Sequence, residues 1–299
     1  MARAMLVGCD FSSSPSKRKP IVLALGTAQQ GRVVLQELVR FDTLESWGHW
    51  LAQPADWIGG FDLPFGLPRE LVLSLGWPTD WLSCMRQFTA MPRDRVRQHF
   101  KAFCDARPAG RKFAHRQTDG PAGSSPSMKW VNPPVAFMMH AGVVRMLDAG
   151  VTLAGIYAPP PSPNLSMDAV QQSSNDLQDV GHQNASHRVA LEAYPALLAR
   201  EFIGHQSYKS DDKAKQTPER LIARKQILQG LDGGQTRLGL RLKLTHGQHD
   251  TLVDDASGDC LDAVLCMVQA AWAREQHLAG HACYGLPVFD RLEGWIVTA

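Results

Sequence analysis

Short apolar runs separated by polar turns dominate the first sixty residues. The runs at 5–9 and 21–25 flank a turn rich in Ser, Pro and Lys, which predicts a β-hairpin. A third apolar run covers 33–39. The apolar period then becomes helical after the Asp-Thr pair at 42–43, a pair typical of a helix N-terminus. A fourth strand is expected over 57–61, so the predicted order is β-β-β-α-β.

A change of pattern follows this core segment. Residues 69–148 have mostly helical periodicity, broken at 107–134 where Gly, Pro and Ser cluster. The polar stretch 171–175 follows a proline-rich break and predicts a poorly ordered linker. We therefore expect one domain over 1–299, with a helical and loop insertion at 69–185.

The core pattern resumes after the insertion. An apolar run at 188–191 predicts a strand, and helices are expected around 196–203 and 218–229. A last helix is expected from near Asp255 to about Ala273. This alternation of strands and helices predicts the α/β class.

Composition excludes several broad classes. The 299 residues are 44% hydrophobic and 20% charged, which excludes disordered and collagen-like chains. No run approaches the roughly 18 to 20 apolar residues of a membrane span, so no membrane partner is expected. The six cysteines are dispersed without a C-x-x-C pair, which favours reduced thiols and a cytoplasmic location.

Carboxylates stand where predicted strands end. Asp10 follows the first strand, Asp62 the fourth, and Glu192 the strand after the insertion. In α/β sheets, ligands collect outside the carboxyl ends of the strands, so these side chains are expected to converge.

Acidic residues also recur on the predicted last helix. Asp255, Asp259 and Asp262 are spaced to share one helix face, while the leucines and valines share another. Crowded carboxylates need a cation, and oxygen ligands select Mg²⁺ or Mn²⁺ over zinc. Two such ions about 4 Å apart would orient a water and stabilise an in-line displacement at phosphorus. The pattern therefore predicts phosphodiester hydrolysis.

Basic residues concentrate in the insertion although the net charge is only +2. Residues 86–117, here called the basic segment, hold nine Lys or Arg against two acids. A basic surface beside an acidic pocket suits a nucleic acid whose phosphates it would bind. The expected substrate contacts are Arg111, Lys112, Arg116, Arg220 and Arg224. Lys209 is expected to contact a phosphate or the transition state.

Short motifs spread along most of the chain resemble a known family. They are GCDFS at 8–12, GFDLPFGLP at 60–68, EAYP at 192–195 and DCLDA at 259–263, with RQTD at 116–119, YK at 208–209 and TPER at 217–220. In this order they resemble the predicted-nuclease family known as domain of unknown function 429.

The resemblance implies a ribonuclease H-like core. Such a core has a five-stranded mixed sheet with antiparallel first strands, helices on both faces, and the order β-β-β-α-β-α-β-α. It also implies a metal-dependent nuclease site. Asp10 and Asp62 would bridge or flank Mg²⁺ or Mn²⁺, Glu192 would complete one site, and Asp259 or Asp262 would hold the second ion.

Two other interpretations stay open at the level of sequence. Actin-like and sugar-kinase-like phosphotransferases share this core order, and Asp10 with the serines at 12–14 resembles their phosphate-binding hairpin. A non-catalytic nucleic-acid-binding protein could use the basic segment alone. The retained acids favour the nuclease.

Overall fold

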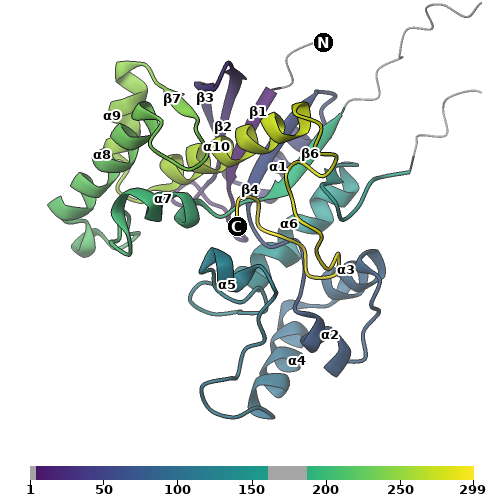
Figure 1. Cartoon of the computed structure of the whole chain (residues 1–299). Coiled ribbons are helices and arrows are strands. Elements are labelled where there is room, and N and C mark those ends of the chain that lie inside the picture. The colour runs from purple at the N-terminus through teal and green to yellow at the C-terminus, as the bar shows by residue number, and fades with distance from the viewer. Residues whose placement is uncertain (1–4, 161–186) are drawn as a thin grey trace, which may run out of the picture.

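The protein is an α/β protein, and its computed structural model describes residues 5–160 and 187–299 (Figure 1). The polar stretch 171–175 and the end of the predicted insertion lie outside these described residues. The strands are β1 (Met5–Asp10), β2 (Ile21–Gln29), β3 (Arg32–Phe41), β4 (Trp57–Asp62), β5 (Thr152–Leu153), β6 (Arg188–Glu192) and β7 (Arg241–Lys243). The helices are α1 (Leu44–Ala52), α2 (Arg69–Ser74), α3 (Trp81–Ala90), α4 (Arg93–Asp105), α5 (Asp119–Ala122), α6 (Val135–Asp148), α7 (Pro195–Ile203), α8 (Pro218–Gly233), α9 (His246–Asp254) and α10 (Asp259–Leu278).

The strands form one mixed sheet in the order β5-β6-β4-β1-β2-β3-β7. The antiparallel hairpin of β1 and β2, the antiparallel β3 and the parallel β4 confirm the predicted β-β-β-α-β order. The described sheet has seven strands where five were expected. The two extra strands, β5 and β7, have two and three residues and are too short to give a periodic pattern.

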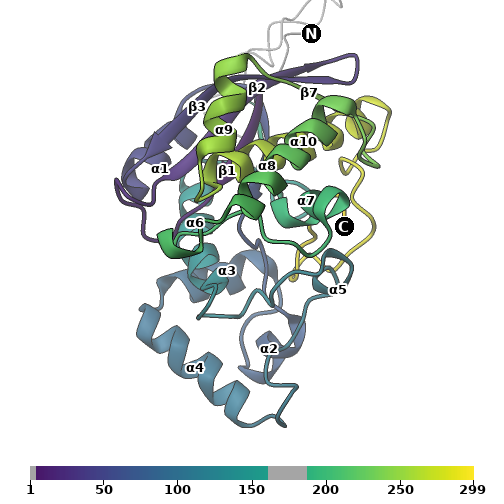
Figure 2. The ribbon, with the colours of Figure 1, turned by 90° about the vertical axis from the view of Figure 1, so that its left-hand side faces the viewer.

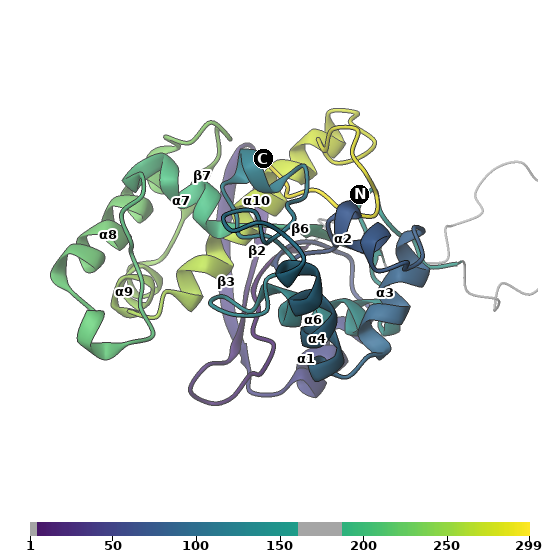
Figure 3. The ribbon, with the colours of Figure 1, turned by 90° about the horizontal axis from the view of Figure 1, so that it is seen from below.

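Helices cover both faces of the sheet. On β1, Val7 and Cys9 belong to the same buried core as Trp47 of α1. Leu6 points the other way and belongs to the core that contains Leu265 of α10. Seen from below, α1 and α6 lie on one side of the sheet, and α7 to α10 lie on the other (Figure 3).

Helix α10 lies unusually close to the centre of the sheet because the facing strands carry glycines. A Cβ atom on Gly8 would lie 1.9 Å from the carbonyl oxygen of Ala263, and one on Gly60 would lie 2.4 Å from that of Cys266. Gly8 and Gly60 are themselves paired in the register of β1 and β4. The pair therefore forms a side-chain-free strip on which the α10 backbone rests.

Helices α2 to α5 form a lobe below the sheet (Figure 2). Aromatic side chains hold α3 and α4 together, with the rings of Phe88 and Phe100 stacked 6.0 Å apart. Arg93 of α4 donates to the carbonyl oxygen of Ser13 at 2.7 Å. The lobe is thereby attached to the loop that follows β1.

The C-terminal helices differ from the sequence prediction. The helix expected from near Asp255 is α10, which begins at Asp259, and a separate helix that was not expected, α9, precedes it. The Asp255 carboxylate accepts a hydrogen bond from the Cys260 amide at 2.8 Å, so it binds the first turn of α10 from outside. Among the helices of residues 5–160 and 187–299, none is long and apolar enough to cross a membrane.

Candidate metal centre

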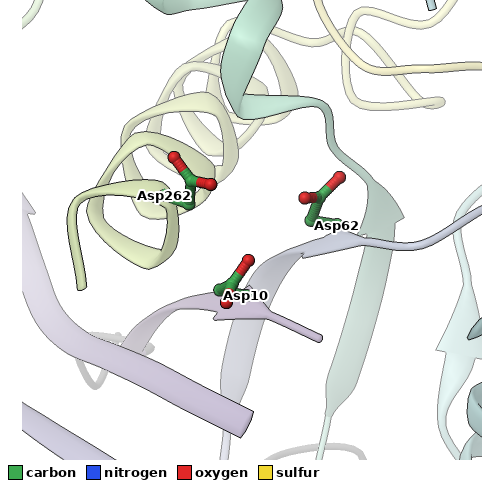
Figure 4. Close-up of side chains that lie close together, drawn as sticks. All are labelled: Asp10, Asp62 and Asp262. Carbon is green, nitrogen blue, oxygen red and sulfur yellow. The ribbon is translucent and has the colours of Figure 1, made fainter. Parts of the chain in front are cut away.

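Three aspartates meet where β1 and β4 end. Asp10 and Asp62 are the last residues of these strands and lie directly opposite each other in the parallel register. Asp262 reaches the same place from the first turn of α10. One carboxylate oxygen from each lies within 4.8 Å of the other two, and the side chains point toward one another (Figure 4). We call Asp10, Asp62 and Asp262 the carboxylate trio.

The local sequence explains this convergence. Gly8 precedes Asp10 by two residues, and Gly60 precedes Asp62 by two residues, so each glycine faces the same side of the sheet as its aspartate. The glycines let α10 approach, and the aspartates one step further along meet its N-terminal turn. The repeated Gly-x-Asp at two strand ends was a signal in the sequence that strand-end acids alone do not convey.

The carboxylate trio is a poor environment for negative charge. Asp10 is 8% exposed and Asp262 is fully buried. Burial, followed by the charge of Asp262, raises the pKa of Asp10 well above its usual range. Burial also raises the pKa of Asp62 to about 7, with Lys209 opposing the shift and Asp262 adding to it.

Asp262 is the member of the trio that has hydrogen-bond partners among the described residues. The Tyr208 hydroxyl donates to its Oδ1 at 2.5 Å, and the Lys209 ammonium binds its Oδ2. The Lys209 side chain stays 39% exposed. With all groups ionised, the trio and Lys209 have a formal charge of −2.

Two arginines expected to contact substrate hold this segment instead. Arg220 donates to the Lys209 carbonyl oxygen at 2.7 Å. Arg224 is 3% exposed and donates to the carbonyl oxygens of Tyr208 and Val253, each at 2.7 Å. Both guanidinium groups therefore position the Tyr208–Lys209 backbone, and burial keeps Arg224 away from any substrate.

Glu192 and Arg116, predicted as a metal ligand and a substrate contact, are paired with each other. Arg116 donates to both carboxylate oxygens of Glu192, at 2.7 and 2.8 Å. The Phe65 amide adds a third bond to Glu192, and Asp119 binds the same guanidinium. Arg116 is 4% exposed. The pair is a buried internal ion pair, whereas Arg111 and Lys112 are exposed as expected.

Asp259 has a separate cation. Lys19, from the loop between β1 and β2, binds its carboxylate at 2.6 Å and also binds Asp211 at 2.8 Å. Of the two candidates on α10, Asp262 is thus the one that belongs to the carboxylate trio. Lys19 was not identified from the sequence, and Tyr208 was noted only as part of the YK motif, because their partners lie far away along the chain.

A small cavity adjoins the trio on the side of Asp62. It has a volume of about 80 Å³ and lies between the sheet and the segments that precede α6. Its walls include Glu192 and Tyr194 from the core side, and Ser125 and Pro133 from the other. The insertion therefore closes over one flank of the carboxylates.

The donor set fits a hard divalent cation. Three carboxylates offer oxygen ligands within one coordination sphere, and oxygen ligands favour Mg²⁺ or Mn²⁺. The carboxylate of Asp10 is more than nine-tenths buried and points into the cluster with no protein donor among the described residues. A divalent cation would also balance the formal charge of −2.

Comparisons of this chain with protein-family models, with curated proteins and with solved structures give no match.

Proposed function

We propose that this protein is a Mg²⁺- or Mn²⁺-dependent nuclease that hydrolyses phosphodiester bonds of nucleic acid. The carboxylate trio carries the proposal. Asp10, Asp62 and Asp262 come from separate elements and converge within 4.8 Å; Asp10 and Asp262 are buried and Asp62 is partly buried, with too few protein cations to neutralise them. Buried acids in this state destabilise a fold unless they serve a bound cation.

The topology supports a ribonuclease H-like core, as the family resemblance implies. The first three strands are antiparallel neighbours, the fourth is parallel to the first, and helices lie on both faces. In this interpretation the strands β6-β4-β1-β2-β3 are the five core strands, and β5 and β7 extend the sheet at its edges.

The side chains at the site have different roles in this proposal. Asp10, Asp62 and Asp262 would hold the cation, which when bound would polarise the phosphate and lower the pKa of a bound water. Tyr208 orients Asp262 through its hydroxyl. Lys209 places an exposed positive charge beside the same carboxylate, where it would stabilise charge that develops on the phosphate.

The basic segment supports nucleic acid as the substrate. Exposed residues such as Arg86, Arg95, Arg111 and Lys112 have no carboxylate partner among the described residues and can bind phosphates. Other cations of the segment are engaged with neighbouring acids, as in the Arg97–Asp94 and Lys101–Asp105 pairs. Because Arg93 attaches α4 to the loop after Asp10, the exposed cations are fixed relative to the trio.

Thermal unfolding with and without millimolar Mn²⁺ tests the metal first. Wild type is expected to gain stability with Mn²⁺, and Asp62→Asn is expected to lose that gain while keeping its fold. Asp42→Asn, an exposed acid outside the site, is the matched control and should behave as wild type. Absence of any shift in wild type would favour the non-catalytic nucleic-acid-binding protein.

A cleavage assay follows for the variants that pass this test. Single- and double-stranded DNA and RNA are incubated with wild type, Asp10→Asn, Asp62→Asn and Asp42→Asn in Mg²⁺ or Mn²⁺. Turnover is expected in wild type and the control, with a loss of at least about a hundredfold in the two site variants. Cleavage by Asp62→Asn at the wild-type rate would refute the site.

A further inference from the structure

We propose that the centre takes one divalent cation, and that protein cations replace the second ion of a two-metal site. This inference rests on the proposed function and specifies its metal content. The sequence predicted two ions because two ions suit a displacement at phosphorus and because acids occupy four matching positions, the last being Asp259 or Asp262. Of these acids, Glu192 and Asp259 lie outside the carboxylate trio, and each is paired with a cation of the protein.

Both carboxylate oxygens of Glu192 already accept hydrogen bonds. Its Oε1 accepts from Arg116, and its Oε2 accepts from both Arg116 and the Phe65 amide. An ion on Glu192 would compete with a guanidinium that is itself buried for the same two oxygens. An unpaired buried charge of this kind is strongly destabilising.

The carboxylate of Asp259 is paired with a lysine. Lys19 binds it at 2.6 Å and is kept in place by a second bond to Asp211. The ammonium therefore occupies one coordination position of the carboxylate that a second ion would need. Lys19 belongs to the loop that follows Asp10, so this counterion comes from the loop that connects the strand of one trio member to β2.

The charge balance agrees with a single ion. The trio and Lys209 have a formal charge of −2, and the further carboxylates on Arg116 and Lys19, those of Asp119 and Asp211, lie outside the trio. One divalent cation makes the centre neutral. A second ion would leave an excess of two positive charges on the trio and Lys209 themselves.

Lys209 is the protein cation that would act in place of the second ion. In a two-metal site the second ion neutralises charge on the reacting phosphate. Here the Lys209 ammonium lies beside Asp262 and is 39% exposed, so it can approach a phosphate that the single cation binds. We assign it the electrostatic role of the second ion.

The number of bound ions is measured by titrating the full-length protein with Mn²⁺ and detecting free Mn²⁺ by electron paramagnetic resonance. The titration is made alone and with a ten-residue phosphorothioate oligothymidylate, because a second ion can require a phosphate. One Mn²⁺ per chain is expected under both conditions. Asp62→Asn should lower the affinity at least about tenfold.

Matched variants separate the two groups of acids. Asp259→Asn and Glu192→Gln are expected to keep one Mn²⁺ with less than about a threefold change in Kd, since neither residue is a ligand. If Glu192→Gln fails to fold by circular dichroism, Asp259→Asn decides alone, because Lys19 is partly exposed and tolerates the loss of its partner.

The outcomes distinguish this inference from the proposed function. Two ions in wild type, or loss of the ion in folded Asp259→Asn or Glu192→Gln, would overturn the single-cation centre and leave the nuclease proposal standing. No bound Mn²⁺ in wild type would overturn both.

Discussion

The carboxyl group of Asp62 is held between two unfavourable states. Ionised, it is largely buried beside the charges of Asp10 and Asp262. Protonated, it no longer offers a full charge to a cation. Burial raises its pKa to about 7, whereas a carboxyl in the unfolded chain titrates near 4. The metal-free fold is therefore more stable when this group has a proton.

The free energy of unfolding should accordingly fall as pH rises from 4 to 7 in EDTA. Between those values the folded chain binds more protons than the unfolded chain, so stability decreases with pH. Three pH units correspond to at most about 4 kcal/mol for Asp62. Urea unfolding at pH 5 and pH 8 measures the difference in wild type, Asp62→Asn and the Asp42→Asn control.

Asp62→Asn should lose much of this dependence, because the titrating group is gone, and should be more stable than wild type at pH 8. The raised pKa of Asp10 leaves the variant a dependence in the same direction. Equal stability of wild type at both pH values would contradict the electrostatic account of the trio.

At the scale of elements, the position of α10 depends on two glycines. A methyl group at Gly8 or Gly60 would overlap the helix backbone, at 1.9 and 2.4 Å from carbonyl oxygens that cannot rotate away. We expect Gly8→Ala or Gly60→Ala to cost about 2–4 kcal/mol and to weaken Mn²⁺ binding, because α10 must move with Asp262. Chemical unfolding and a Mn²⁺ titration measure the two effects.

Gly247 provides the matched control for these variants. It lies in α9, and a Cβ atom there would meet nothing within 4 Å. Gly247→Ala should raise stability by roughly 0.5–1 kcal/mol and leave Mn²⁺ binding unchanged. If Gly8→Ala behaved like this control, close packing of α10 would not position Asp262.

Helix α8 acts on the site through Arg224. Arg224→Ala leaves the Tyr208 and Val253 carbonyl oxygens without their donor, which should cost about 2–4 kcal/mol. Lys225 is the exposed neighbour of Arg224 and provides the control. Lys225→Ala should change the free energy of unfolding by less than about 0.5 kcal/mol. Affinity for oligonucleotides should not change in Lys225→Ala, whereas folded Arg224→Ala should bind them more weakly, because Arg224 positions the backbone next to Lys209.

The helices and strands that could be predicted are those whose formation depends on residues close together in the sequence. The β1–β2 hairpin follows from two apolar runs around a turn, and the start of α1 follows from the Thr43 cap. The strand β7 has three residues and no such signature. Asp10 and Asp62 could be placed together because parallel neighbouring strands end at the same edge.

Ion pairs between residues that lie far apart along the chain could not be predicted from the sequence. Arg116 and Glu192 are 76 residues apart, and Lys19 and Asp259 are 240 residues apart. Composition treats the five acids as equivalent, whereas the structure separates the carboxylate trio from the acids of the pairs Glu192–Arg116 and Asp259–Lys19. Predicting that difference requires the arrangement of the insertion against the core.

At the scale of the whole molecule, charge is unevenly distributed. The basic segment has seven more positive than negative charges in a chain whose net charge is +2. Replacing Arg95, Arg111 and Lys112 together by Ala should weaken oligonucleotide binding and reduce the slope of log Kd against log salt by about 2–3. Fluorescence anisotropy at several salt concentrations measures this slope.

Metal binding provides the control for the triple variant. All three side chains are exposed and lie outside the carboxylate trio, so the Mn²⁺ affinity should stay at the wild-type value. An unchanged salt slope would indicate that nucleic acid binds elsewhere on the protein.

The register of β1 with β4 has a consequence for how the protein tolerates change. Asp10 and Asp62 are partners across one parallel pair, so the distance between their Cα atoms is the spacing of neighbouring strands, about 4.8 Å in any sheet. Peptide hydrogen bonds fix that spacing whatever the core side chains are. Repacking the interior should therefore alter the melting temperature while leaving the selectivity among divalent cations intact, because two of the three ligands are aligned by the backbone itself.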